Sequence, residues 1–316
     1  MTTLAIEAHS LGKHYKEATA LSDLSLQVEP QQIYALLGPN GAGKTTTLSI
    51  LTTLLTPSSG TARVAGFDVV QQAHEVRRRI GVTFQEIVLD RDLTGRQVLD
   101  IHGQLYRLGK AERTRRISEL VALVQLEEAI DRGVKTYSGG MKRRLELARG
   151  LMTNPEILFL DEPTQGLDPQ NRVGIWDYIR TLNREHNLTV LLTTHYMEEA
   201  EALAHRVGII DHGTMVAEGT PAGLVASIGT ELIRVQGSGD TAHFINTITT
   251  MPFVLRVDQD QQQGAIQIYV DNSTRRLLDV VQMAGSNGMR VDDISIARPT
   301  LGDAFLHYTG RGLRDS

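Results

Sequence analysis

Short apolar runs recur along the first two thirds of the chain, and each ends at turn-forming or polar residues. The runs IYALLG (33–38), ILFLDEP (157–163) and LTVLLTTH (188–195) are interleaved with stretches of helix-like spacing. Strands that are buried on both faces of a sheet read as continuous apolar runs, whereas half-exposed strands alternate. The pattern therefore predicts an α/β domain built around buried parallel strands.

Two parts of the chain depart from this pattern. Residues 88–152 carry helical spacing without a convincing strand, which indicates a helical insertion between strands. After residue 219 the α/β pattern stops, and short alternating segments with two helix-like stretches between them follow in the order βαββαβ. We therefore expect a first domain over residues 1–224 and a small α+β, ferredoxin-like domain over residues 225–316.

Composition narrows the classes of function. The chain has 316 residues, 41% of them hydrophobic and 22% charged, so we expect ordinary globular domains. The net charge of -5 predicts no nucleic-acid partner, and the basic runs at 77–79 and 142–144 read as solvated helix faces. No apolar stretch reaches the length of a membrane helix and cysteine is absent, so we expect a cytoplasmic protein without disulfides.

A glycine-rich loop follows the first apolar run and precedes the helix-like stretch TTTLSILTTLL. It fits G-x-x-x-x-G-K-[ST], which cradles phosphates with backbone N–H groups at a helix N-terminus. In this motif the lysine contacts the β- and γ-phosphates, and the hydroxyl that follows it binds Mg²⁺. The sequence therefore predicts a phosphate-binding loop made of Gly38, Pro39, Asn40, Gly41, Ala42, Gly43, Lys44, Thr45 and Thr46.

Two adjacent carboxylates, Asp161 and Glu162, end the second apolar run. Successive strand residues point to opposite faces, so the two acids serve different purposes. Asp161 suits Mg²⁺ coordination, and Glu162 can polarise a water molecule that attacks the γ-phosphorus. Taken alone, the pair is better explained as a helix cap, and the phosphate-binding loop is what favours the catalytic interpretation.

Polar side chains follow two further apolar runs. His195 follows the run that ends at Thr194, and Gln85 follows the run that begins at Gly81. Ligands of α/β sheets bind at the carboxyl ends of the strands, so both side chains are candidates for sensing the γ-phosphate. The amide of Gln85 can complete the Mg²⁺ shell or hold the attacking water, but taken singly it is a weak signal.

A second anion receptor is predicted about twenty residues before the carboxylate pair. Ser138, Gly139 and Gly140 stand where a strong helix pattern begins, with a hydroxyl and open backbone N–H groups. A chain with one phosphate-binding loop offers this site no second phosphate of its own. The plain alternative is a flexible turn that caps the helix.

Together these segments resemble the ATP-binding cassette (ABC) ATPases, over residues 4 to about 220. Residues 38–45 look like the Walker A loop, Gln85 like the Q-loop, 138–140 like the signature motif and 161–162 like the end of the Walker B strand. Asp168 looks like the aspartate of the D-loop, and His195 like the switch histidine. Tyr137, Met141 and Gly166 depart from the usual residues of the signature and the D-loop.

The resemblance implies a P-loop NTPase fold with a central, mostly parallel sheet, an antiparallel β subdomain and a helical insertion. It implies a head-to-tail homodimer that binds ATP and Mg²⁺, each ATP lying between the Walker A loop of one chain and the signature motif of the other. Tyr15 matches the position of the aromatic residue that stacks on adenine.

The segments VTFQEIVLDRDLTGRQVLDIHGQLYRLG and ARPTLGDAFLHYTG resemble the daunorubicin-type drug-resistance branch. Such members pair with a separate ABC-2 type permease on the cytoplasmic side of the membrane, which implies export of a drug-like or hydrophobic compound. Two alternatives are a non-transport ABC ATPase of the translation or repair type, and an importer ATPase with a regulatory C-terminal domain. The sequence shows neither two cassettes nor a long coiled-coil insertion, the features that distinguish the non-transport members.

Overall fold

The computed structural model describes residues 4–16, 18–228, 231–260 and 265–310. The chain divides into two compact units, Met1–Val216 and Ala217–Ser316. Helix α8 (Pro221–Ser227) lies wholly in the second unit, whereas the boundary expected from the sequence, after residue 224, falls within this helix.

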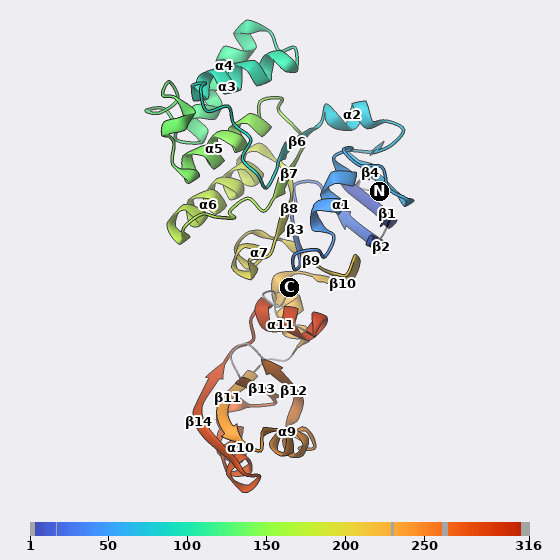
Figure 1. The fold of residues 1–316 in the computed structure, drawn as a ribbon, viewed down its shortest axis with the longest axis vertical. Helices are drawn as coiled ribbons and strands as arrows, with labels where there is room; N and C mark the ends of the chain where they lie inside the picture. Colours follow the sequence, from blue (N-terminus) through green and yellow to red (C-terminus); the bar gives the residue numbers. More distant parts are fainter. Residues whose placement is uncertain (1–3, 17, 229–230, 261–264, 311–316) are drawn as a thin grey trace. The chain divides into compact units, whose positions relative to one another are not determined.

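A ten-stranded sheet organises the first unit, in the order β5-β4-β1-β2-β10-β9-β3-β8-β7-β6 (Figure 1). Five neighbouring strands are parallel, and the three strands predicted from apolar runs are wholly buried among them. The expected α/β fold with a mostly parallel sheet is thereby confirmed. These five strands are β9 (Arg206–Asp211), β3 (Ile33–Leu37), β8 (Thr189–Thr194), β7 (Ile157–Asp161) and β6 (Ile80–Thr83).

The other half of the sheet is largely antiparallel. Here β1 pairs with both β2 and β4, and β4 pairs with β5, while β2 and β10 form a parallel pair. The bounds are β1 (Ile6–His14), β2 (Thr19–Val28), β4 (Ser59–Val64), β5 (Phe67–Asp68) and β10 (Thr214–Gly219).

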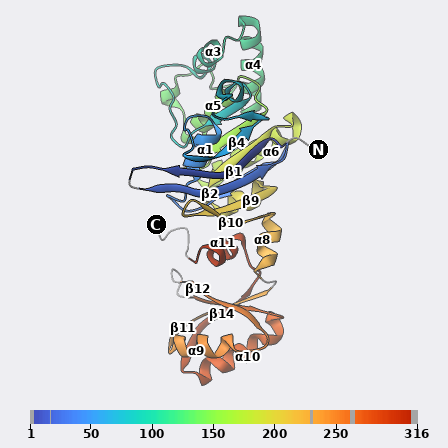
Figure 2. The same cartoon turned by 90° about the vertical axis from the view of Figure 1, so that its right-hand side faces the viewer.

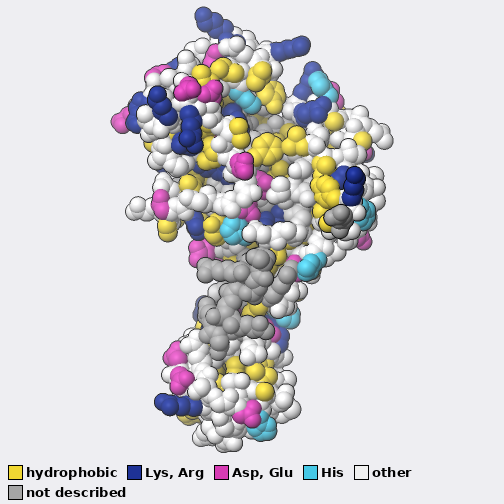
Figure 3. Space-filling view, viewed as in Figure 1, with side chains coloured by type: hydrophobic (Ala, Val, Ile, Leu, Met, Phe, Trp, Pro, Cys, Tyr) yellow, Lys and Arg dark blue, Asp and Glu magenta, His cyan; other side chains and the backbone are white. Residues whose placement is uncertain are grey.

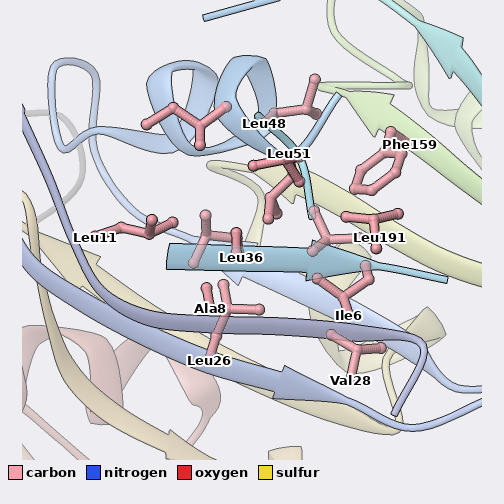
Figure 4. Packing of buried hydrophobic residues seen from close by; sticks show 14 of the residues in the cluster. Ile6, Ala8, Leu11, Leu26, Val28, Leu36, Leu48, Leu51, Phe159 and Leu191 are labelled. Carbon is pink, nitrogen blue, oxygen red and sulfur yellow. The ribbon is translucent and has the colours of Figure 1, made fainter. Parts of the chain in front are cut away.

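The main core lies where the antiparallel strands, helix α1 (Lys44–Leu51) and the central strands meet. Figure 4 shows Ile6 and Val28 of the antiparallel strands facing Leu36, Phe159 and Leu191 of the central ones. Each of these side chains is at most 2% exposed, and fully burying one contributes about 1.5–3 kcal/mol. This packing holds the start of α1, and with it the glycine-rich loop, against the central strands.

Helices occupy most of the segment between β6 and β7 and the crossovers around it. Side-chain caps begin three of them, at Thr94, Ser138 and Asp168, so that backbone N–H groups at these helix starts are satisfied. The bounds are α2 (Ala73–Arg77), α3 (Gly95–Leu105), α4 (Lys110–Leu123), the 3₁₀ turn η1 (Val134–Thr136), α5 (Gly139–Gly150), α6 (Pro169–His186) and α7 (Met197–Leu203).

The second unit contains a four-stranded antiparallel sheet in the order β12-β13-β11-β14, the arrangement of a split-βαβ domain. Two helices, α9 and α10, cover one face of this sheet (Figure 2) and share a core with it. The elements are β11 (Glu231–Gly239), α9 (Thr241–Thr249), β12 (Val254–Asp260), β13 (Ala265–Val270), α10 (Ser273–Ser286), β14 (Met289–Ala297) and α11 (Leu301–Thr309).

Candidate active site

The glycine-rich loop connects the end of β3 to the start of α1. Gly41 and Gly43 have φ values of 79° and 107°, in the left-handed region that favours glycine. A Cβ at Gly38 would lie 2.4 Å from the carbonyl oxygen of Ile210, so this position also requires glycine. The Nζ atom of Lys44 donates to the carbonyls of Gly38 at 2.8 Å and Pro39 at 3.0 Å. The loop thus folds back on its own lysine.

Asp161, the last residue of β7, faces the hydroxyl of Thr45. The Thr45 hydroxyl lies 3.2 Å from Asp161 Oδ2, and Thr193 of β8 donates to Asp161 Oδ1. Burial raises the pKa of Asp161, while the two threonine hydroxyls oppose this shift. A hydroxyl and a carboxylate oxygen converging at the end of a phosphate-binding loop are the hard oxygen donors that Mg²⁺ prefers. The residues present therefore fit a magnesium ion.

Glu162 turns the opposite way and meets two other predicted site residues. Its Oε1 lies 3.4 Å from Lys44 Nζ, and its Oε2 lies 3.1 Å from Nδ1 of His195. Burial acts to raise the pKa of Glu162, but the neighbouring His195 and Lys44 outweigh it and hold that pKa below its usual value. The carboxylate is therefore ionised at neutral pH and available as a base.

The backbone of Glu162 is in a conformation that is rare for a non-glycine residue, with φ of 46°. No helix begins until Pro169, so the pair 161–162 does not form the helix cap that the sequence left open. Instead, the N–H of Glu162 donates to the hydroxyl of Thr193 at 3.1 Å. Backbone strain at this point aims the carboxylate at Lys44 and His195.

Gln85 lies beyond the end of β6, at the same edge of the sheet as Asp161. Its side chain is exposed, and its amide donates to Oε1 of Gln165 at 2.7 Å. The structure therefore brings Gln85 to the turn after Glu162 rather than to Thr45 and Asp161.

Ser138 caps α5, and its exposed hydroxyl accepts from the N–H of Met141 at 3.2 Å. A Cβ at Gly140 would lie 2.7 Å from Oδ1 of Asn171, so glycine here allows α5 to approach α6 closely. Asp168 caps α6 and accepts from the backbone N–H of the same Asn171 at 3.0 Å. The signature motif and the D-loop aspartate therefore meet at one asparagine side chain within the chain.

The two aromatic residues that the sequence singled out are placed very differently. Tyr15 is 49% exposed, with the Lys13 ammonium 5.5 Å from its ring centre, so one ring face can accept a planar group. Tyr137 is 4% exposed and donates from its hydroxyl to the Ala129 carbonyl at 2.7 Å. Tyr137 differs from the usual signature residue, and packing within the helical insertion accommodates its side chain.

One residue of the site was misinterpreted from sequence. The run 142–144 was expected to form a solvated helix face, but Arg143 is 2% exposed and donates to main-chain carbonyls beside the carboxylate pair. The i, i+3 spacing of Arg143 and Glu146 was the available signal, since buried arginines need acidic partners.

The fold and the site define a P-loop nucleotide-binding ATPase. Residues 21–165 match the ABC transporter family. The chain is 42% identical to a daunorubicin resistance ATP-binding protein, DrrA2, of Streptomyces coeruleorubidus, over 98% of this chain and 96% of that protein. It is 38% identical to the Nod factor export ATP-binding protein I of Paraburkholderia xenovorans, over all of both chains.

A dimeric ATP-binding cassette solved in a post-hydrolysis state with ADP and Pi is 27% identical. It superimposes with a TM-score of 0.62 over 68% of this chain and 98% of that one. The chain therefore belongs to the ABC transporter family, as one of its ATP-binding, ATP-hydrolysing subunits. The resemblance to the drug-resistance branch, expected from the sequence, is confirmed.

Proposed function

We propose that two copies of this chain hydrolyse ATP with Mg²⁺ in a head-to-tail dimer and power export of a drug-like or hydrophobic compound. Transport runs through a separate ABC-2 type permease, with the dimer on the cytoplasmic side of the membrane and no nucleic-acid partner. The observation that carries this proposal is near-complete alignment with export and resistance ATP-binding proteins. Within the part of the chain that the structure describes, no helix is long and apolar enough to cross a membrane.

In this proposal each site residue keeps one task. Lys44 and the loop N–H groups bind the β- and γ-phosphates, and Thr45 and Asp161 hold Mg²⁺, with Gln85 joining them when the site closes. The bound metal supplies positive charge against the phosphate oxygens. Glu162 holds the attacking water and accepts its proton, while His195, beside Glu162, contacts the γ-phosphate.

The remaining predicted residues belong to the shared parts of the dimer. Ser138, Gly139 and Gly140 bind the γ-phosphate held by the other chain, and Asp168 supports that interface. Tyr15 stacks on adenine.

The surface we assign to the permease surrounds a cavity of about 290 Å³ between β6 and helices α3 and α5. Its lining includes Leu54, Phe84 and Tyr106, which are 61%, 38% and 46% exposed. Figure 3 shows hydrophobic side chains gathered between the helical insertion and α2. Burial and the Arg149 cation lower the pKa of the lining residue His102 to about 4, so its imidazole is neutral and suits an apolar partner. Phe84 directly precedes Gln85, so a helix docked here can act on the active site.

Tyr106→Ala should reduce recovery of the permease with the tagged ATPase by about tenfold, because it removes an exposed aromatic side chain from the contact. ATP hydrolysis by the isolated subunit should stay unchanged. Val70→Ala is the matched control, since Val70 is 49% exposed and lies outside the cavity lining. Equal recovery of the permease by both variants would place the docking surface elsewhere.

The proposed function is tested with the chain and the neighbouring permease gene product together. In vesicles, we expect ATP hydrolysis that stops when EDTA removes Mg²⁺. We also expect ATP-dependent movement of a hydrophobic dye across the membrane, away from the side on which the ATPase lies. ATP-dependent uptake with a solute-binding protein would identify an importer instead. Hydrolysis indifferent to the permease would support a non-transport ATPase.

A further inference from the structure

The side chain of Arg143 is 3% exposed and lies beneath the carboxyl edge of the central strands. All five of its N–H groups have acceptors, at distances of 2.6 to 3.3 Å. Four acceptors are main-chain carbonyls and one is a carboxylate: Pro163, Phe84, Asp161, Glu162 and the side chain of Glu146. A guanidinium is the only side-chain group that presents five donors in one plane, so no other residue can make this set of bonds.

These carbonyls belong to the two segments that carry the catalytic groups. Phe84 immediately precedes Gln85, and Arg143 Nη1 donates to its carbonyl at 2.7 Å. On the other side, Nη2 donates to the Glu162 carbonyl at 2.6 Å. One guanidinium therefore fixes the distance between the Q-loop and the catalytic glutamate.

The bond to Glu162 holds a strained residue. The φ angle of Glu162 is 46°, and such a conformation persists only where the surroundings over-determine it. Thr193 accepts from the N–H of Glu162, and Arg143 donates to its carbonyl. These two hydrogen bonds hold the peptide groups before and after the Cα of Glu162, and they therefore fix the direction of its carboxylate.

A second arginine extends the same network along α5. Glu146 is fully buried and accepts from Arg143 at 3.3 Å and from Arg149 at 3.2 Å. Arg149 in turn donates to the Val88 carbonyl at 3.2 Å. Helix α5 thus contacts the segment 84–88 at both ends, at Phe84 through the buried Arg143 and at Val88 through the partly exposed Arg149.

We propose that Arg143 is a positioning residue that links the two ATP sites of the dimer through helix α5. This inference rests on the proposed function, in which Ser138 at the start of α5 binds the ATP held by the other chain. A shift of α5 on meeting that nucleotide moves Arg143, and with it the Glu162 and Phe84 carbonyls of its own chain. Occupation of one site therefore sets the geometry of the catalytic glutamate in the other.

The test is Arg143→Lys in the full chain, because lysine keeps the charge but satisfies at most three of the five acceptors. We expect kcat to fall by about 10²-fold, since a small misplacement of a catalytic group costs that much. The Hill coefficient for ATP should fall towards 1, while the affinity and stoichiometry of ATP binding stay at wild-type values. A purely structural defect would instead lower the stoichiometry and leave the Hill coefficient unchanged.

Arg116→Lys is the matched control, because Arg116 is also a mostly buried arginine that donates to a main-chain carbonyl, that of Leu151. It should keep both kcat and the Hill coefficient. Arg143→Lys with full ATP binding and wild-type values of both would overturn the inference.

If Arg143→Lys does not fold, Glu146→Gln is the variant that tests the link between the two ATP sites. It keeps the shape of the side chain but loosens both arginines, so kcat should fall about tenfold and the Hill coefficient should drop with it. Unchanged values would overturn the inference.

Glu162→Gln is measured alongside: wild-type turnover in that variant contradicts the proposed function itself. Loss of turnover there, with normal Arg143→Lys, removes only the link between the sites.

Discussion

Glu162→Gln should slow ATP turnover by about 10²–10⁴-fold and leave ATP binding in place, because it removes the general base. The amide has the size of the carboxylate, so it still fits beside Lys44 and His195, 3.4 Å and 3.1 Å away in the native site. It cannot accept a proton from the attacking water. The closed state before hydrolysis should therefore accumulate as an ATP-bound dimer, which light scattering after size-exclusion chromatography will detect.

The control for this variant is Glu156→Gln, at the position just before β7. The Glu156 side chain is 64% exposed, so its neutralisation should change neither turnover nor association. Phosphate release is measured in single-turnover and steady-state conditions, and binding with a fluorescent ATP analogue. Wild-type phosphate release by Glu162→Gln would remove Glu162 from the role of base.

Much of the site could be predicted because its signals are local. The loop 38–43 needs glycines for its own backbone, and the apolar run before Asp161 shows a buried strand whether or not its neighbours are known. Asp161 and Glu162 face different groups, as strand alternation predicts, but Glu162 lies beyond the end of β7 and its φ of 46° sets where its carboxylate points. Their roles in catalysis, like those of Gln85 and His195, stay predictions.

What the sequence concealed depends on contacts between distant segments. Arg143 donates to Phe84, 59 positions away, so no local window distinguishes it from a solvated arginine in a basic run. The hydroxyl of Thr193 reaches Asp161 only because β7 and β8 pair in one register. The exact end of the first compact unit, at Val216, is not visible in the sequence for a similar reason, because a short helix such as α8 carries no sign of the unit that it joins.

The strongest test of the shared ATP site is complementation between two inactive chains. One chain carries Lys44→Ala, which removes the cation of its Walker A loop. The second chain carries Ser138→Arg, whose side chain fills its signature motif. Ser138 is exposed, so the arginine should be accommodated, at a cost of about 0.5–2 kcal/mol for the lost helix cap. Each homodimer should be inactive, because both of its sites contain the defect.

In a head-to-tail dimer, a mixed pair has one site with both defects and one site with neither. Mixing the two chains should therefore restore hydrolysis, to about a quarter of the wild-type rate where the sites turn over independently and less where they are coupled. Adding Lys44→Ala to the Ser138→Arg chain supplies the control, since no pairing with the Lys44→Ala chain then leaves an intact site. A mixture with no more activity than this control is the result expected if each chain completes its own site, because the two substitutions would then disable separate sites in every pairing.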